Sequence, residues 1–140
     1  MQCRTAESWR SRIAAIQADG IASIADAILD RWFPKSLRAS PDALPWRTML
    51  LRTDPVGYIQ TCRALALADL REGLATLTLP TLLIAGSEDG STPPALVQET
   101  AALIQGAHVT VLQGSGHIPA IDAPEATAQA IAAFMRGLND

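Results

Sequence analysis

Residues 80–134, PTLLIAGSEDGSTPPALVQETAALIQGAHVTVLQGSGHIPAIDAPEATAQAIAAF, decide the fold. The segment opens with a continuous apolar run closed by Gly86, which is typical of a strand covered on both faces in a parallel sheet. Thr92 with two following prolines opens a predicted helix that Gly106 ends, and HVTVL at 108–112 is the next predicted strand. A strand, a helix and a second strand in this order predict an α/β fold with a right-handed crossover between parallel strands.

The last predicted helix follows the loop after the second strand. Asp122 and Glu125 are three residues apart and resemble a capping box at its start. The spacing of the residues that follow predicts one buried face on this helix, made of Thr127, Ile131, Phe134 and Leu138.

Asp89 and His117 lie in the loops that follow the two predicted strands. Because parallel strands end at the same edge of a sheet, the two loops are expected to converge where ligand sites of open α/β sheets form. A carboxylate there can accept the Nδ1 proton of an imidazole and leave Nε2 free as a base. An aspartate in GSEDG is also a common turn former, and a histidine in a Gly-Ser loop is commonly solvated. The matched positions favour the pair, so we predict that Asp89 lies within hydrogen-bond reach of His117 Nδ1.

Residues 5–67 show a helical period and no alternation typical of strands. Thr5 is predicted to cap a first helix that reaches Asp19, and Pro34 stops a second helix. The segment KSLRASPDALP is predicted to be irregular, and a third helix covers roughly residues 46–52. Thr53 or Asp54 caps a fourth helix. The sequence therefore predicts a small bundle of short helices ahead of the α/β segment.

Composition limits the possible functions. The chain has 140 residues, 49% of them hydrophobic, which is enough for one ordinary core. A net charge of −3 provides no basic surface for nucleic acid or for an anionic membrane. No apolar run reaches the roughly 18 to 20 residues that a membrane span needs, and the polar start MQCRTAESWR is unlike a secretory segment, so we expect a cytosolic protein. Cys3 and Cys62 have no metal-ligand spacing, Cys62 is expected to be buried, and we expect no metal and no cofactor.

Two stretches of the second half, LREGLATLTLPTLLIAGSEDGSTPP and VLQGSGHIPAIDAPEATAQAIAAF, resemble the carboxyl-terminal part of an α/β-hydrolase. The resemblance makes Asp89 the acid and His117 the base of a catalytic triad. The helical half, especially TAESWRSRIAAIQADGIASIADAILDRWF and DPVGYIQTCRALALADLR, is similar to the cap of 3-oxoadipate enol-lactonases, enzymes of aromatic-compound degradation. It implies a helical cap over residues 1–70, lying above the carboxyl edge of the sheet, and the last βαβα segment of the core over residues 71–140.

The sequence departs from this family at the nucleophile. Such hydrolases carry a serine in a Gly-x-Ser-x-Gly elbow upstream of the cap, and this sequence contains no such elbow. Ser87 and Ser115 lie in the loops of the acid and the histidine, and no helix follows Cys3 in a way that would present it as a nucleophile. The chain is therefore expected to comprise the cap and the final third of the sheet.

The resemblance also implies a mechanism and a substrate class. An upstream serine, deprotonated by His117, would attack a lactone carbonyl, and water would release the acyl group as a 3-oxo acid. Arg63 and Arg71 are candidate clamps for the substrate carboxylate, although arginines on helices are usually solvated. Trp32 could line the pocket, with packing as its commoner role. We expect the chain to be inactive alone; the alternative is a non-catalytic remnant or half-protein that associates with itself or with a partner through an exposed strand edge.

Overall fold

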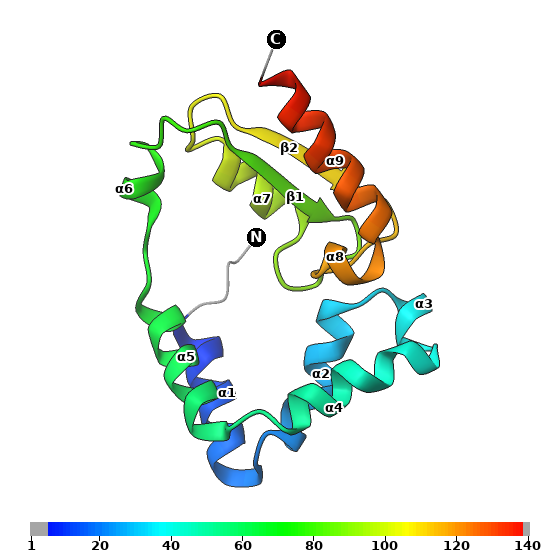
Figure 1. Cartoon of the computed structure of the whole chain (residues 1–140). Coiled ribbons are helices and arrows are strands. Elements are labelled where there is room, and N and C mark those ends of the chain that lie inside the picture. The colour runs from blue at the N-terminus through cyan, green and yellow to red at the C-terminus, as the bar shows by residue number, and fades with distance from the viewer. Residues whose placement is uncertain (1–5, 139–140) are drawn as a thin grey trace. The chain divides into compact units, whose positions relative to one another are not determined.

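The computed structural model describes residues 6–138 and divides the chain into two compact units (Figure 1). One unit contains the described residues up to Asp30 together with Lys35–Asp69. The other contains Arg31–Pro34 and the described residues from Leu70 onward. Cys3 and Thr5, which the sequence analysis singled out, lie outside the described residues. Across residues 6–138, no helix has both the length and the apolar character needed to span a membrane.

The first unit is helical, as predicted. Helix α1 (Ala6–Asp19) packs against α5 (Pro55–Leu67), and α2 (Ala22–Trp32) follows α1 after a tight turn. Gly20 makes that turn with φ +76°, a conformation that favours glycine, and its N–H donates to the Ile16 carbonyl at 2.9 Å. The apolar residues buried in this unit come from all these helices and from α4: Ile16, Ile21, Ala25, Ile28, Leu29, Leu50 and Cys62. The predicted burial of Cys62 is confirmed.

The segment KSLRASPDALP is not irregular, so that prediction was wrong. It contains α3 (Lys35–Arg38) and a 3-10 helix, η1 (Pro41–Ala43), and it runs directly into α4 (Leu44–Leu51). Ser40 begins η1 by accepting a hydrogen bond from the Asp42 N–H at 3.2 Å. The prolines of this segment occupy first-turn positions, where a missing N–H costs little, and so they start helices here instead of breaking them.

Asp54, one of the two candidate caps, begins α5. Its carboxylate accepts hydrogen bonds from the N–H groups of Val56 at 3.3 Å and Gly57 at 2.8 Å. Asp54→Ala is therefore expected to lower the free energy of unfolding by about 1 kcal/mol, measured by urea denaturation. Thr53→Ala is the matched control, because the Thr53 hydroxyl donates to the Met49 carbonyl of α4 and does not cap α5. An equal or greater loss in Thr53→Ala would contradict the assignment of the cap.

The second unit contains the predicted parallel strands. Strand β1 (Leu82–Gly86) pairs in parallel with β2 (His108–Leu112), and Leu82 lies opposite His108. Helices α7 (Pro94–Ala101) and α9 (Pro124–Gly137) both pack against the two strands, while α6 (Arg71–Leu74) precedes β1 and α8 (Pro119–Asp122) precedes α9 (Figure 1). The order of strand, helix, strand and helix is confirmed, and it gives the α/β segment that the sequence predicted.

Burial in this unit is lower than the sequence predicted. In β1 only Ala85 and Gly86 are buried, and α9 has no buried residue. Ile131 and Leu138, expected to be buried, are 47% and 45% exposed. The two strands offer too little apolar surface to cover the whole apolar face of α9, so part of that face stays exposed.

Two predicted helix starts were also wrong. Helix α7 begins after Pro93 with no side-chain cap, because the Thr92 hydroxyl binds Asp89 instead. Helix α9 begins after Ala123, because the Asp122 carboxylate binds Ser115 and Gly116 instead of capping that helix. In both cases a polar side chain with capping spacing makes a hydrogen bond within the loops that follow the strands.

Candidate active site

Asp89 and His117 meet in the loops after the carboxyl ends of β1 and β2. Asp89 Oδ2 lies 2.9 Å from His117 Nδ1, so the predicted contact is present. The Asp89 side chain is 4% exposed, whereas the imidazole is 33% exposed. A buried carboxylate on Nδ1 and a partly open ring are the arrangement expected of a base that uses Nε2.

The Asp89 carboxylate is held by several donors besides His117. Oδ1 accepts from the N–H groups of Ser91 at 2.6 Å and Thr92 at 2.9 Å, and Oδ2 accepts from the Thr92 hydroxyl at 2.8 Å. Burial raises the pKa of Asp89, but the hydrogen bonds from His117, Thr92 and Ser91 together outweigh burial and leave the pKa below its ordinary value. The carboxylate therefore stays charged and keeps its orientation toward the imidazole.

Thr92 is a site residue that the sequence analysis missed. Its hydroxyl lies 2.8 Å from Asp89 Oδ2 and 3.2 Å from His117 Nδ1, so it contacts both members of the pair. Sequence reasoning assigned Thr92 to a helix start because Pro93 and Pro94 follow it. The available signal was the spacing in DGST, because an aspartate commonly accepts hydrogen bonds from N–H groups two and three residues later.

Hydrogen bonds join the acid loop, which follows β1 and carries Asp89, to the histidine loop, which follows β2 and carries His117. The Ser87 hydroxyl accepts from the Gly114 N–H at 2.8 Å, and the Glu88 N–H donates to the Ser115 carbonyl at 2.8 Å. Gly86 has no room for a side chain, since a Cβ there would lie 2.0 Å from the Gly116 carbonyl oxygen. Ser115 is completely buried. Both loop serines thus have structural contacts.

The end of α2 contacts both loops within the second unit. The Gly90 N–H donates to the Arg31 carbonyl at 3.0 Å, and the His117 N–H donates to the Trp32 carbonyl at 2.6 Å. These carbonyls come from the last turn of α2, where no further helical N–H is available to them. The structure therefore brings Trp32 beside His117 through the backbone, and the Trp32 ring packs edge-on to Phe33 with centroids 6.4 Å apart.

The two candidate arginines lie on different elements. Arg63 is exposed on α5 in the first unit, where its Nη1 lies 3.4 Å from Gln60 Oε1. Arg71 is exposed in α6, which the chain passes before it enters β1. Asp89 follows the opposite, carboxyl end of that strand, so the fold does not bring Arg71 to the Asp89–His117 pair (Figure 1).

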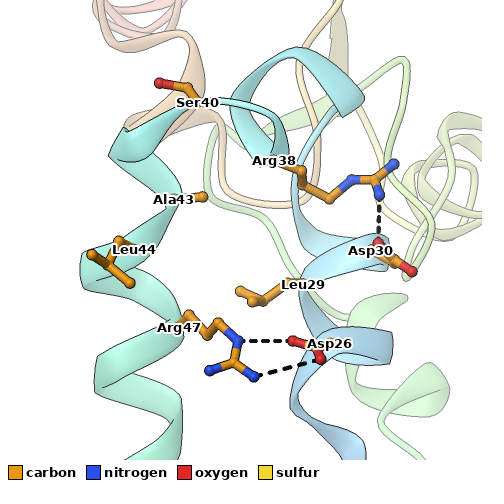
Figure 2. A pocket seen from close by; sticks show the side chains of 8 residues that line it. All are labelled: Asp26, Leu29, Asp30, Arg38, Ser40, Ala43, Leu44 and Arg47. Carbon is orange, nitrogen blue, oxygen red and sulfur yellow. Dashed lines mark hydrogen bonds and ion pairs between the residues drawn. The ribbon is translucent and has the colours of Figure 1, made fainter.

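The first unit contains a separate pocket of about 400 Å³ between α2 and the segment from α3 to α4. Figure 2 shows two ion pairs across it, one between Arg47 Nε and Asp26 Oδ1 at 2.9 Å and one between Arg38 and Asp30. The hydrogen bond and the charge of Arg47 lower the pKa of Asp26. Because the four side chains pair with one another near solvent, the pocket has the features of a helix–helix contact. Its lining residues are Asp26, Leu29, Asp30, Arg38, Ser40, Ala43, Leu44 and Arg47.

The lowered pKa of Asp89 predicts how stability depends on pH. In the unfolded chain the pKa of an aspartate is about 3.9, and in the folded protein the pKa of Asp89 is lower. The ionised carboxylate therefore stabilises the fold fully at pH values above the unfolded pKa, and this stabilisation is lost as the pH falls through the folded pKa. The unfolding free energy of the parent should therefore fall more steeply at acid pH than that of Asp89→Asn, measured by urea denaturation across the acid range. Glu88→Gln, which removes an exposed neighbouring carboxyl, should follow the parent. If the unfolding free energies of the parent and of Asp89→Asn depend on pH in the same way, the lowered pKa of Asp89 in the folded protein is contradicted.

Known proteins match the chain over almost its whole length. The sequence pattern of the alpha/beta hydrolase family matches residues 4–130. The chain belongs to this family. It is 35% identical over 137 residues to 3-oxoadipate enol-lactonase 1 of Acinetobacter baylyi, a match that covers 96% of this chain and 51% of that protein.

Two solved structures are also similar to this member of the alpha/beta hydrolase family. The enol-lactonase from Burkholderia xenovorans LB400 superposes with a TM-score of 0.86 at 31% identity, over 94% of this chain and 51% of the other. A thermophilic esterase from Thermogutta terrifontis superposes with a TM-score of 0.84 at 26% identity, over 100% of this chain and 53% of the other. The chain thus spans about half the length of the relatives it matches.

Proposed function

We propose that this chain supplies the acid and base of a serine-type hydrolase of enol-lactones. The contact between Asp89 and His117 Nδ1 carries the proposal, because it fixes a charged carboxylate behind an imidazole whose ring is partly open. His117 would act as the general base, Asp89 would orient it, and Thr92 would hold Asp89 in place. The nucleophile and the oxyanion hole would come from a polypeptide that corresponds to the other half of the relatives.

The reaction follows from these roles. Nε2 of His117 takes the proton of the serine as its oxygen attacks the lactone carbonyl, and Asp89 stabilises the imidazolium that forms. Collapse of the tetrahedral intermediate breaks the ring ester bond and leaves an acyl-enzyme, while the imidazolium gives its proton to the departing enolate and His117 becomes neutral again. Water, deprotonated by His117, then attacks the acyl carbonyl, and the imidazolium returns this proton to the serine oxygen as the acyl group is released. Without the serine there is no nucleophile, and without the oxyanion hole nothing stabilises the negative charge that develops on the lactone carbonyl oxygen. We therefore propose that the chain is inactive alone.

Similarity supports a lactone as substrate. The match to 3-oxoadipate enol-lactonase 1 includes the helical residues as well as the strands, so the likeness is not limited to the part that carries Asp89 and His117. A free carboxylate on the substrate would need a cation, for which Arg63 remains a candidate and the position of Arg71 is unfavourable. Trp32 remains a candidate for the pocket wall because its backbone adjoins His117.

The second unit has the surface that a partner polypeptide would cover. Among the described residues, β1 pairs with β2 alone and so has a free edge. Leu79, just before β1, is 70% exposed, and Ile131 and Met135 on α9 are 47% and 54% exposed. A free strand edge and exposed apolar side chains in the same unit favour association through added strands. A polypeptide carrying the opening strands of the hydrolase fold is the occupant we propose.

Complementation tests this function. The half of the Acinetobacter baylyi relative that this chain does not match would be co-expressed with the chain, and the pair would be assayed on 3-oxoadipate enol-lactone and on an aryl acetate. We expect saturable lactone hydrolysis by the pair and none by either half. A pair faster on the acetate would favour an esterase, and a complex that forms but hydrolyses neither compound would contradict the proposal. Failure to associate would favour the non-catalytic remnant.

A further inference from the structure

Asp122 has a position that capping of α9 does not explain. It is the last residue of α8, and both carboxylate oxygens point back to the loop that carries His117. Oδ1 accepts a hydrogen bond from the Ser115 hydroxyl at 2.5 Å, and Oδ2 accepts one from the Gly116 N–H at 2.8 Å. The carboxylate therefore holds the two residues that immediately precede His117.

The loop is fixed from its other side as well. The His117 N–H donates to the Trp32 carbonyl, and a Cβ on Gly116 would lie 2.2 Å from that same carbonyl oxygen. Ser115 is completely buried, and its carbonyl accepts from the Glu88 N–H next to Asp89. The backbone before the histidine is thus held between Asp122 and the end of α2, and its carbonyl is tied to the acid loop.

We propose that Asp122 is a positioning residue that sets the orientation of the His117 imidazole toward Asp89. The inference rests on the proposed role of His117 as a base. Asp122 acts through the Ser115 hydroxyl and the Gly116 N–H and touches neither the imidazole nor a substrate. A hydrogen bond to an ionised group is strong and directional, so two of them from adjacent residues fix both the position and the tilt of the loop. Release of this contact lets the imidazole turn away from Asp89, and the Nδ1–H tautomer loses its acceptor.

The tautomer of His117 in the 140-residue chain reports this positioning directly. Long-range ¹H–¹⁵N spectra of the neutral imidazoles distinguish a proton on Nδ1 from one on Nε2, and the chain has only two histidines. The parent is expected to show His117 mainly as the Nδ1–H tautomer. In Asp122→Asn, the ratio of Nδ1–H to Nε2–H should fall about tenfold, the effect of losing a charge-assisted hydrogen bond.

Three controls make the experiment decisive. Glu125→Gln removes an exposed carboxyl three residues later and should leave the ratio unchanged. His108, whose ring contacts Phe134 at 5.6 Å, reports from β2 that the fold is intact. Asp89→Asn replaces the charged acceptor with a neutral amide and should lower the ratio as well. A parent without the Nδ1–H tautomer would contradict the proposed base.

An Nδ1–H tautomer that persists unchanged in a folded Asp122→Asn would overturn the inference about Asp122 and leave the base intact. If Asp122→Asn does not fold, Ser115→Ala removes only one of the two donors to Asp122 and is expected to lower the ratio severalfold. An unchanged ratio in that variant would overturn the inference equally.

Discussion

Replacing His117 with alanine in the complemented hydrolase should lower kcat for the lactone about 10⁶-fold, because removal of the histidine of a working triad has an effect of this size. The imidazole is the group that takes the serine proton, and its Nδ1 is already held 2.9 Å from Asp89. Residual activity should come from the serine half alone, through its oxyanion hole and substrate binding. The measurement is steady-state hydrolysis of 3-oxoadipate enol-lactone by the purified pair.

His108→Ala is the matched control for that variant. His108 is exposed on β2, where its ring contacts Phe134, and it lies at the opposite end of the strand from the histidine loop. We expect kcat within about twofold of the parent, as for surface substitutions away from special features. If kcat falls as much in His108→Ala as in His117→Ala, both variants impair the assembly of the two halves, and the loss in His117→Ala is no evidence for proton transfer.

Gly116→Ala should destabilise the second unit by about 3 kcal/mol or more, the upper range for overpacking in a rigid environment. The added Cβ would lie 2.2 Å from the Trp32 carbonyl oxygen and 3.1 Å from the Phe33 Cα, and both are backbone atoms that cannot turn away. The loop must therefore move, and with it the His117 N–H that donates to the same Trp32 carbonyl. Urea denaturation measures the loss of stability.

Gly73→Ala provides the comparison. Gly73 lies in α6, has no atom within 4 Å of an added Cβ, and has no positive φ. Alanine is the better helix former, so the variant should be as stable as the parent or more stable by up to about 1 kcal/mol. Equal unfolding free energies for Gly116→Ala and Gly73→Ala would contradict the close packing of the histidine loop against the end of α2.

The parts of the fold that the sequence predicted correctly depend on local patterns. The runs at 81–86 and 108–112 are apolar and short, and a helix-length segment separates them, so their parallel pairing follows from chain connectivity. The same connectivity places Asp89 and His117 at one edge of the sheet, where the structure has them 2.9 Å apart. The helical period of the first unit likewise required no long-range information.

The errors at the helix starts concern polar side chains that bind the loops after the strands instead of capping a helix. Thr92 and Asp122 both have the spacing of helix caps, but Thr92 binds Asp89 and Asp122 binds Ser115 and Gly116, and the capping pattern alone does not distinguish these contacts from a cap. The burial of Phe33, which directly follows α2, could not be predicted, because its neighbour in the histidine loop, Gly116, comes more than eighty residues later. Exposure of Ile131 could not be predicted either, since it depends on how many strands the sheet has.

The location of the nucleophile is the central claim, and covalent labelling followed by intact-mass measurement tests it most directly. A fluorophosphonate that reacts with an activated serine, releasing fluoride, would be incubated with the chain, with the serine half and with the complemented pair. The account predicts no adduct on the 140-residue chain in any sample and a stoichiometric adduct on the serine half of the pair, lost when His117 is alanine. An adduct on this chain, at Ser87, Ser115 or any other residue, would contradict it.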